Sequence, residues 1–189
     1  MKIVAYSRIP GETIPQPLPV DIIPDSAIVP YNRPVFLPDF TRSWAADICP
    51  AYRISRLGKG ITPKFAPRYY DAVTLALRLI PTQILQQLHN RMQPTGVAGV
   101  FDNCLPLGQW IPLTDTPPDL HIQAPGIDLQ ITHRHCDIDH TLAAISEIAT
   151  LKTGDIILPC RLPLATVMTP DTDFTIELND TPVLPIRLR

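Results

Sequence analysis

Residues 101–110, FDNCLPLGQW, are the stretch that decides most about the fold of this chain. The stretch contains Pro106, one of 23 prolines among 189 residues. Proline is more than twice as frequent here as its usual share of about 5%. Because proline neither donates to a sheet ladder nor fits inside a helix, the prolines scattered from Pro10 to Pro185 predict short strands and many turns.

Extended segments are predicted on both sides of this stretch. Residues 72–80, AVTLALRLI, alternate with a period of two, which places Val73 and Leu79 on one face of a strand and Arg78 on the other. Pro50 favours an edge position or a bulge for its own strand. Further strands are expected at residues 2–6, 35–37, 47–55, 156–158, 174–178 and 183–188, the last two joined by a turn at Asn179 and Asp180.

Two helices are predicted. One begins at Pro81 and carries an apolar stripe of Ile84, Leu85, Leu88 and Met92. The other is expected to be capped by Asp139 and to end before residues 152–154, KTG. Strands outnumber helices and no linker is visible, so residues 1–189 are interpreted as one strand-rich α+β domain. Its residues 1–40 are expected to hold an N-terminal strand and a proline-rich connector at residues 10–19.

The composition excludes several classes of protein. Hydrophobic residues make up 45% of the chain, and 16 Lys and Arg against 18 Asp and Glu leave a net charge of −2, which argues against disorder and against a nucleic-acid binder. No apolar run approaches the roughly 18 residues of a membrane helix, and residues 3–6 are too short for a signal peptide, so we expect a cytoplasmic protein without membrane contact. The four cysteines lie far apart, which indicates reduced, buried thiols rather than a disulfide framework or a zinc ribbon.

The stretch FDNCLPLGQW resembles a segment of the fumarylacetoacetate hydrolase family, whose pattern is K-x-F-D-x-x-x-P-[IL]-G-x-[WF]. The resemblance continues through residues 150–158, TLKTGDIIL, and backward through residues 24–27, PDSA, and 64–71, KFAPRYYD, so it covers nearly the whole chain in order. It implies a mixed β-sandwich roll with a few short peripheral helices, usually assembled as a homodimer. It also implies a divalent-metal site for hydrolysis, isomerisation or decarboxylation of 2-oxo acids and acylpyruvates.

The family's metal ligands are changed in this chain. The family holds Mg²⁺ or Mn²⁺ with a Glu-x-Glu pair and a later Asp, and the resemblance places these positions on Asp47, Cys49 and Arg78. A guanidinium about 4 Å from a divalent ion is opposed by roughly 8 kcal/mol at an effective dielectric near 20. The resemblance therefore implies that the metal cofactor is lost. We expect Arg78 to lie near Asp47 and to form an internal ion pair with it.

Other positions of the family's pocket have changed as well. The lysine expected two residues before Phe101 is Gly99, and the family's T-G-T-P loop reads PCRL at residues 159–162. Arg8 is the main polar residue retained in the N-terminal segment. Prolines at positions 50, 81 and 159 lie beside three former active-site segments, and the pocket is either open or filled. The resemblance thus implies a vestigial pocket formed by Arg8, Gly99, Phe101, Asp102, Cys160 and Arg161.

These changes favour a catalytically inactive homologue, a pseudoenzyme, with a role in binding, regulation or assembly. An alternative is a weak or metal-independent enzyme in which Arg78 and Arg8 hold the carboxylate of a small oxo acid. A third hypothesis is a partner subunit of an active family enzyme. The expected partners are a second copy of the chain, a small carboxylate ligand or that active enzyme.

The segment 133–140, HRHCDIDH, is the densest cluster of possible metal ligands. On a strand, His133 and His135 would share a face, and Cys136 or His140 could complete a transition-metal site. The alternative is a polar loop that enters a helix, with the histidines in solvent. The sequence leaves both open.

Overall fold

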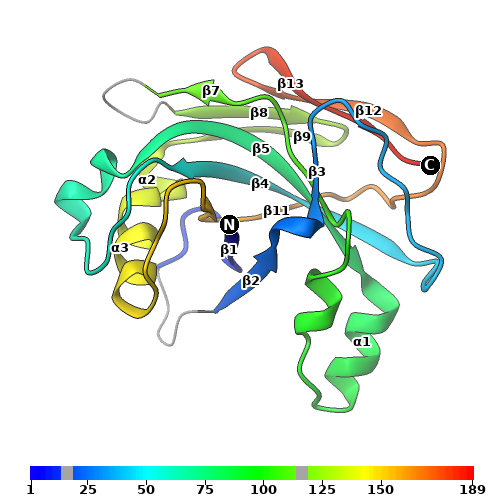
Figure 1. Cartoon of the computed structure of the whole chain (residues 1–189). Coiled ribbons are helices and arrows are strands. Elements are labelled where there is room, and N and C mark those ends of the chain that lie inside the picture. Colours follow the sequence, from blue (N-terminus) through cyan, green and yellow to red (C-terminus); the bar gives the residue numbers. More distant parts are fainter. Residues whose placement is uncertain (14–18, 114–118) are drawn as a thin grey trace.

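The computed structural model describes residues 1–13, 19–113 and 119–189 (Figure 1). Part of the predicted proline-rich connector, residues 14–18, lies outside the described residues. The main sheet is mixed, because β1 and β10 are parallel whereas its other described neighbours are antiparallel. In spatial order its strands are β2 (Val20–Pro24), β1 (Lys2–Tyr6), β10 (Ile156–Leu158), β4 (Trp44–Ile54), β5 (Tyr70–Pro81) and β7 (Ile111–Pro112), and β11 (Leu162–Pro163) also pairs with β4.

Two smaller sheets complete the strand pairing. An antiparallel sheet consists of β13 (Thr181–Arg187), β12 (Asp173–Leu178), β8 (Leu120–Ala124) and β9 (Ile127–Ile131). The short strands β3 (Ile28–Val29) and β6 (Leu105–Pro106) form a parallel pair. The α-helices are α1 (Thr82–Asn90), α2 (His133–Cys136) and α3 (Ile138–Ile148), and the 3₁₀ turns are η1 (Asp25–Ala27), η2 (Pro63–Arg68) and η3 (Gly96–Gly99). The strand-rich α+β class is confirmed.

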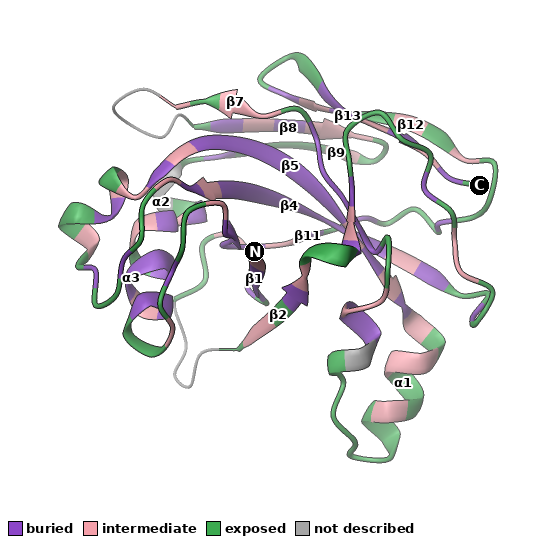
Figure 2. Cartoon of the chain, in the orientation of Figure 1, coloured by how far each residue is buried: buried purple, intermediate pink, exposed green. Residues whose placement is uncertain are grey.

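The curved pair β4 and β5 runs through the middle of the molecule, with the antiparallel sheet on one side and α3 on the other (Figure 1). Both strands are buried along most of their length (Figure 2). The predicted alternation in β5 holds, since Val73 and Leu79 lie on one face and Arg78 lies opposite Asp47 of β4 on the other. Thr74 and Ala76 on the second face are buried too, because both faces of these strands are covered.

Pro50 lies in a central strand rather than at an edge. On one side β4 pairs with β5 along its length. On the other side β10 pairs with Tyr52 and Arg53, and β11 pairs with Asp47 and Ile48, so the described ladder is interrupted beside Pro50. The missing N–H of proline is tolerated at this gap.

The predicted helices form, but their ends differ from the expectation. The first begins after Pro81 and ends at Asn90, so Met92 lies beyond it with a φ of 50° and is exposed. The second is capped by Asp137, not by Asp139, because the Asp137 carboxylate accepts the backbone N–H of His140. Asp139 is in the first turn and accepts a hydrogen bond from the Tyr70 hydroxyl, 2.9 Å away.

Three other local expectations can be compared with the structure. The strand expected at residues 35–37 is reduced to an isolated bridge from Val35 to Leu188. The strand alternative for residues 133–136 is wrong, because these residues form α2. The turn between β12 and β13 is confirmed at Asn179 and Asp180, whose φ values of 51° and 60° are those that a tight hairpin requires.

The stretch at residues 101–110 joins the two large sheets. The backbone N–H of Gly108 donates to Leu75 of β5, and the next N–H, of Gln109, donates to Val183 of β13. A few residues earlier, the carbonyl of Cys104 accepts from Leu79, also in β5. The stretch is thus bonded to both sheets at the point where they pack together.

Candidate functional site

A pocket of about 270 Å³ lies where the resemblance placed the family's site. Asp47, Arg78, Gly99 and Arg161 line it, together with Asp21 of β2, which the sequence reasoning did not single out. The hollow includes two of the three positions that the resemblance assigns to the metal site, Asp47 and Arg78, whereas the third, Cys49, is buried and is not part of the lining. A larger hollow of about 500 Å³ has an apolar lining and contains none of the predicted site residues. We take the smaller one as the candidate site, because the charged groups converge there.

Two ion pairs organise the pocket, and neither is the predicted pair of Arg78 with Asp47. Arg78 Nη2 lies 2.6 Å from Asp21 Oδ2, and Arg161 Nη1 lies 3.3 Å from Asp47 Oδ2. Asp47 and Arg78 are opposite each other in the β4–β5 ladder, as expected. The partners differ because β11 pairs with β4 beside Asp47 and brings the neighbouring Arg161 within reach, while the long side chain of Arg78 extends to β2.

The pocket balances its charges internally. Burial raises the pKa of Asp47, and the nearby guanidiniums of Arg161 and Arg78 offset only part of that effect. Burial alone would lower the pKa of Arg78, but the hydrogen bond to Asp21 and the negative charges near the guanidinium together outweigh burial and raise the pKa, so Arg78 stays charged. When all four groups are ionised, the two arginines and two aspartates that line the pocket sum to zero charge.

Cys49 is not an activated nucleophile. Its side chain is buried, and burial together with the charge of Asp47 raises the pKa of the thiol to about 12. The thiolate is therefore scarce at neutral pH. This environment agrees with the interpretation of Cys49 as a buried structural residue.

The residues at the former metal positions do not fit a hard divalent cation. Mg²⁺ and Mn²⁺ require several oxygen ligands, but these positions hold one carboxylate, one thiol and one guanidinium. The carboxylate of Asp47 is already paired with Arg161, and Arg78 acts on the same group. Within residues 1–13, 19–113 and 119–189, no three His, Cys, Asp or Glu side chains are placed to hold a metal ion.

Gly99 makes room for Arg78. A Cβ at position 99 would lie 2.5 Å from Arg78 Nη2, the same atom that binds Asp21. A side chain at position 99 and the present position of Arg78 therefore exclude each other. The two changes from the family pattern, lysine to Gly99 and aspartate to Arg78, are sterically linked.

This linkage can be tested with a double-mutant cycle. We expect Gly99→Ala to lower the free energy of unfolding by about 1–2 kcal/mol, because the new methyl group pushes the guanidinium away from Asp21. In an Arg78→Ala background the same substitution should cost less than about 0.5 kcal/mol. Urea unfolding of the four proteins measures both values. Equal costs in the two backgrounds would contradict the linkage.

Arg8 is not among the residues that line the pocket. It is 2% exposed, and its guanidinium donates to backbone carbonyls of Glu12 at 2.7 Å and Cys136 at 2.5 Å. Longer bonds reach the carbonyls of Pro159 and His135. Arg8 thus holds three segments together, and its guanidinium is engaged by backbone carbonyls outside the pocket.

Three other residues that were predicted to form the vestigial pocket also lie outside the lining of the observed pocket. Phe101 packs against Phe40 and Trp44, with ring centroids 5.3 and 5.4 Å away. Asp102 is exposed. Cys160 is buried beside Cys136. The pocket therefore contains Gly99 and Arg161 from the predicted set, and the other members serve packing or lie at the surface.

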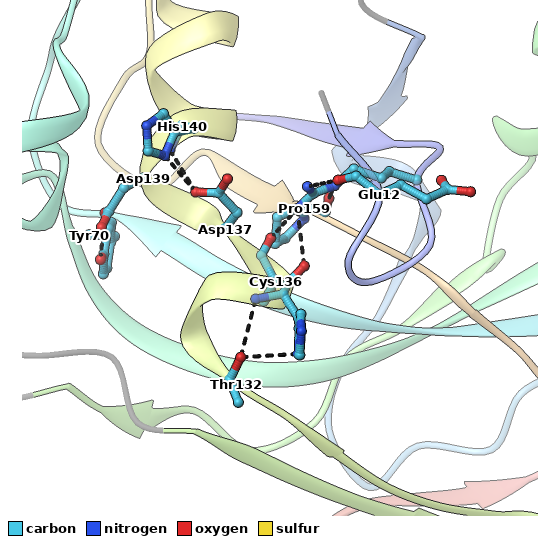
Figure 3. Close-up of polar contacts among 10 residues, drawn as sticks. Glu12, Tyr70, Thr132, Cys136, Asp137, Asp139, His140 and Pro159 are labelled. Atoms are coloured by element: carbon cyan, nitrogen blue, oxygen red, sulfur yellow. Dashed lines mark hydrogen bonds and ion pairs between the residues drawn. The ribbon is translucent and has the colours of Figure 1, made fainter. Parts of the chain in front are cut away.

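The described histidines of the 133–140 segment have separate partners. His135 Nδ1 lies 3.0 Å from Thr132 Oγ1, and His140 Nδ1 lies 2.8 Å from Asp137 Oδ1 (Figure 3). The side chain of His133 lies outside the described part of the structure. The segment forms α2 and the first turn of α3, so its first residues are helical rather than the polar loop of the second alternative.

In the described residues, the helices are too short or too polar to cross a lipid bilayer.

The sequence matches no protein-family model and no curated protein, but solved structures match its fold. A protein described as belonging to the fumarylacetoacetate hydrolase family, from Yersinia pestis, is 23% identical over 100% of this chain and 92% of its own, with a TM-score of 0.84. Fumarylpyruvate hydrolase from Pseudomonas aeruginosa, solved with Mn²⁺ and pyruvate, is 15% identical over 100% of this chain and 89% of its own, with a TM-score of 0.84. The 5-carboxymethyl-2-hydroxymuconate delta-isomerase from Mycobacterium smegmatis is 21% identical over 99% of this chain and 78% of its own, with a TM-score of 0.79.

At these identities the likeness establishes the fold. The chain has the fold of fumarylacetoacetate hydrolase family proteins, a fold shared by hydrolases and isomerases. The resemblance stated from the sequence is confirmed to that extent.

Proposed function

We propose that this chain is a catalytically inactive homologue of the metal-dependent fumarylacetoacetate hydrolase family. It would keep the fold and use it for binding, regulation or assembly. The observation that carries the proposal is the pair of guanidiniums, Arg78 and Arg161, that line the pocket with Asp47. A divalent ion at this place would meet two guanidiniums and two carboxylates, and each carboxylate is already paired with one of the guanidiniums.

The chemistry of the family also needs a group that moves a proton, and that group is missing. The position that resembles the family's lysine is Gly99, and the space beside it is taken by Arg78. Cys49, at the second ligand position, is protonated at neutral pH because its thiol pKa is raised to about 12. The fumarylpyruvate hydrolase with the same fold was solved with Mn²⁺ and pyruvate. Of the positions that the resemblance assigns to the metal and the base, only Asp47 carries a carboxylate here, and no lysine stands at position 99.

A small carboxylate is the ligand that we propose for the pocket. A volume of about 270 Å³ suits a molecule of a few carbon atoms, and a guanidinium binds carboxylate through two parallel hydrogen bonds. The ligand must compete with Asp21 or Asp47 for that guanidinium, so we expect weak binding. We further propose that the chain forms a homodimer, or assembles with an active family enzyme.

The test is an assay of acylpyruvates and oxaloacetate with and without Mg²⁺ or Mn²⁺, beside an active metal-dependent family hydrolase as a control. We expect no turnover above the uncatalysed rate and no stimulation by either metal. Metal-stimulated turnover would refute the proposal. Turnover without metal that disappears in Arg78→Ala would instead support a metal-independent enzyme, an alternative that the engagement of Arg8 elsewhere makes weaker.

A further inference from the structure

Two buried cysteines from distant parts of the sequence lie in contact. Cys136, at the end of α2, and Cys160, between β10 and β11, have their sulfur atoms 3.6 Å apart. Both side chains are fully buried, and both are free thiols in this structure. A disulfide requires a sulfur–sulfur distance of about 2.05 Å, so the two atoms need to approach by only about 1.5 Å.

The chain segments that carry the two thiols are held together independently of the sulfur contact. The guanidinium of Arg8 donates to the carbonyl of Cys136 and also to that of Pro159, the residue before Cys160. The backbone N–H of Arg161, the residue after Cys160, donates to the carbonyl of Arg8 at 2.8 Å. Since Arg8 connects both segments, the proximity of the thiols is a fixed feature of the fold.

A small oxidant can come close to the pair. A hollow of about 260 Å³ is lined by His135, which precedes Cys136, and by Leu162, two residues after Cys160. Part of the wall is formed by Ile9, Pro10 and Gly11, the segment that follows Arg8. Hydrogen peroxide is little larger than water and fits in such a space, so a local opening at this wall is enough to expose the sulfurs.

We propose that Cys136 and Cys160 are a redox-sensitive pair that forms an intramolecular disulfide with peroxide. One thiol loses its proton, its thiolate attacks a peroxide oxygen, and the O–O bond breaks to give a sulfenic acid and hydroxide, which takes up that proton and becomes water. The second thiolate attacks that sulfur and expels hydroxide, which takes up a proton to give a second water. In total the two thiols lose two electrons and two protons, and one peroxide becomes two waters.

The surroundings of the pair make this reaction slow. The hydrogen bond with Cys136, together with burial, raises the pKa of the Cys160 thiol. The reactive thiolate is therefore scarce at neutral pH, and in a reducing compartment the pair remains a dithiol. Oxidation is expected over hours under excess peroxide, and a dithiol reductant should reverse it.

Cys104 offers a matched control inside the same chain. Its side chain is equally buried, but its thiol lies 3.5 Å from the carbonyl oxygen of Gly99 rather than beside another sulfur. Burial raises its pKa as well, to about 11. The two environments differ in the presence of a second thiol, so the control isolates that factor.

The test treats the full-length reduced protein with hydrogen peroxide and measures its intact mass and its disulfide-linked peptides. We expect a loss of about 2 Da, a single linked peptide pair that contains Cys136 and Cys160, and recovery of the original mass with dithiothreitol. The 2 Da decrease in mass should also occur in the Cys104→Ser protein and should be absent in the Cys160→Ser protein. If Cys160→Ser does not fold, the peptide map of the wild-type protein decides. Four free thiols after treatment, stepwise gain of oxygen, or a disulfide that involves Cys49 or Cys104 would overturn the proposal.

Discussion

Replacing Asp155 with alanine is expected to lower the free energy of unfolding by about 3–5 kcal/mol. The Asp155 carboxylate is buried and accepts the backbone N–H groups of Lys2 at 2.9 Å and Lys152 at 2.8 Å. It also pairs with the Lys2 ammonium. The substitution leaves these donors without their acceptor at the place where β1 enters the sheet beside β10. Urea unfolding with the β-sheet circular dichroism signal measures the loss.

The effect of Asp155 should depend on pH in a defined direction. Burial alone would raise the pKa of Asp155, but the hydrogen bonds from Lys2 and Lys152 outweigh it and hold the pKa below its ordinary value of 3.8. A depressed pKa in the folded state means that the ionised carboxylate stabilises the fold. Its contribution is complete above pH 3.8 and is lost as the pH falls through the lower folded value.

A surface carboxylate serves as the control for this substitution. Asp128 pairs with His121, but its side chain is 72% exposed. We expect Asp128→Ala to change the free energy of unfolding by less than about 0.5 kcal/mol. Equal stability of the Asp155→Ala and Asp128→Ala proteins would contradict the structural role of Asp155. The role would also be contradicted if the difference in free energy of unfolding between wild type and Asp155→Ala grew below pH 3.8.

Replacing Gly108 with alanine is expected to lower the free energy of unfolding by about 2–3 kcal/mol. A Cβ at this position would lie 2.7 Å from both Thr74 Oγ1 and the Val183 carbonyl oxygen, and 3.2 Å from the Leu75 carbonyl oxygen. Two of these atoms belong to the backbone of the two large sheets, so they cannot move aside as a flexible side chain can. The sheets must separate locally, which weakens the hydrogen bonds of residues 108 and 109.

Gly96 is the matched control for Gly108. A Cβ there meets nothing within 4 Å. Gly96→Ala should therefore leave the free energy of unfolding within about 0.5 kcal/mol of wild type. Thermal or urea unfolding of the two variants in parallel makes the comparison, and equal stabilities would refute the close approach at Gly108.

The two largest predicted losses of stability, for Asp155→Ala and Gly108→Ala, concern residues in the segments that resemble the family. Gly108 belongs to FDNCLPLGQW and Asp155 to TLKTGDIIL. In the structure the first residue lets two sheets approach and the second joins the start of β1 to β10. The sequence could predict the fold because the residues retained in these segments are the ones that hold it together. By contrast, the positions that changed, such as Arg78 and Gly99, line the pocket.

Three other features could not be predicted from the sequence, because each depends on a contact between segments that only the folded chain brings together. The period of two in residues 72–80 places Arg78 on a face, but it does not say how far the long side chain reaches, so the partner Asp21 was missed. Arg8 resembles a pocket residue, yet its guanidinium turns to backbone carbonyls that only the folded chain brings together. Asp137 and Asp139 are both good caps, and the tertiary hydrogen bond from Tyr70 engages the second.

The most direct test of the central claim is a Mn²⁺ titration of the wild-type protein and of Asp47→Asn, followed by electron paramagnetic resonance of the free ion. Because the guanidiniums of Arg78 and Arg161 accompany Asp47 in the pocket, we expect no saturable site with a dissociation constant below about 1 mM in either protein. A stoichiometric site of micromolar affinity in the wild-type protein that disappears in Asp47→Asn would contradict the account.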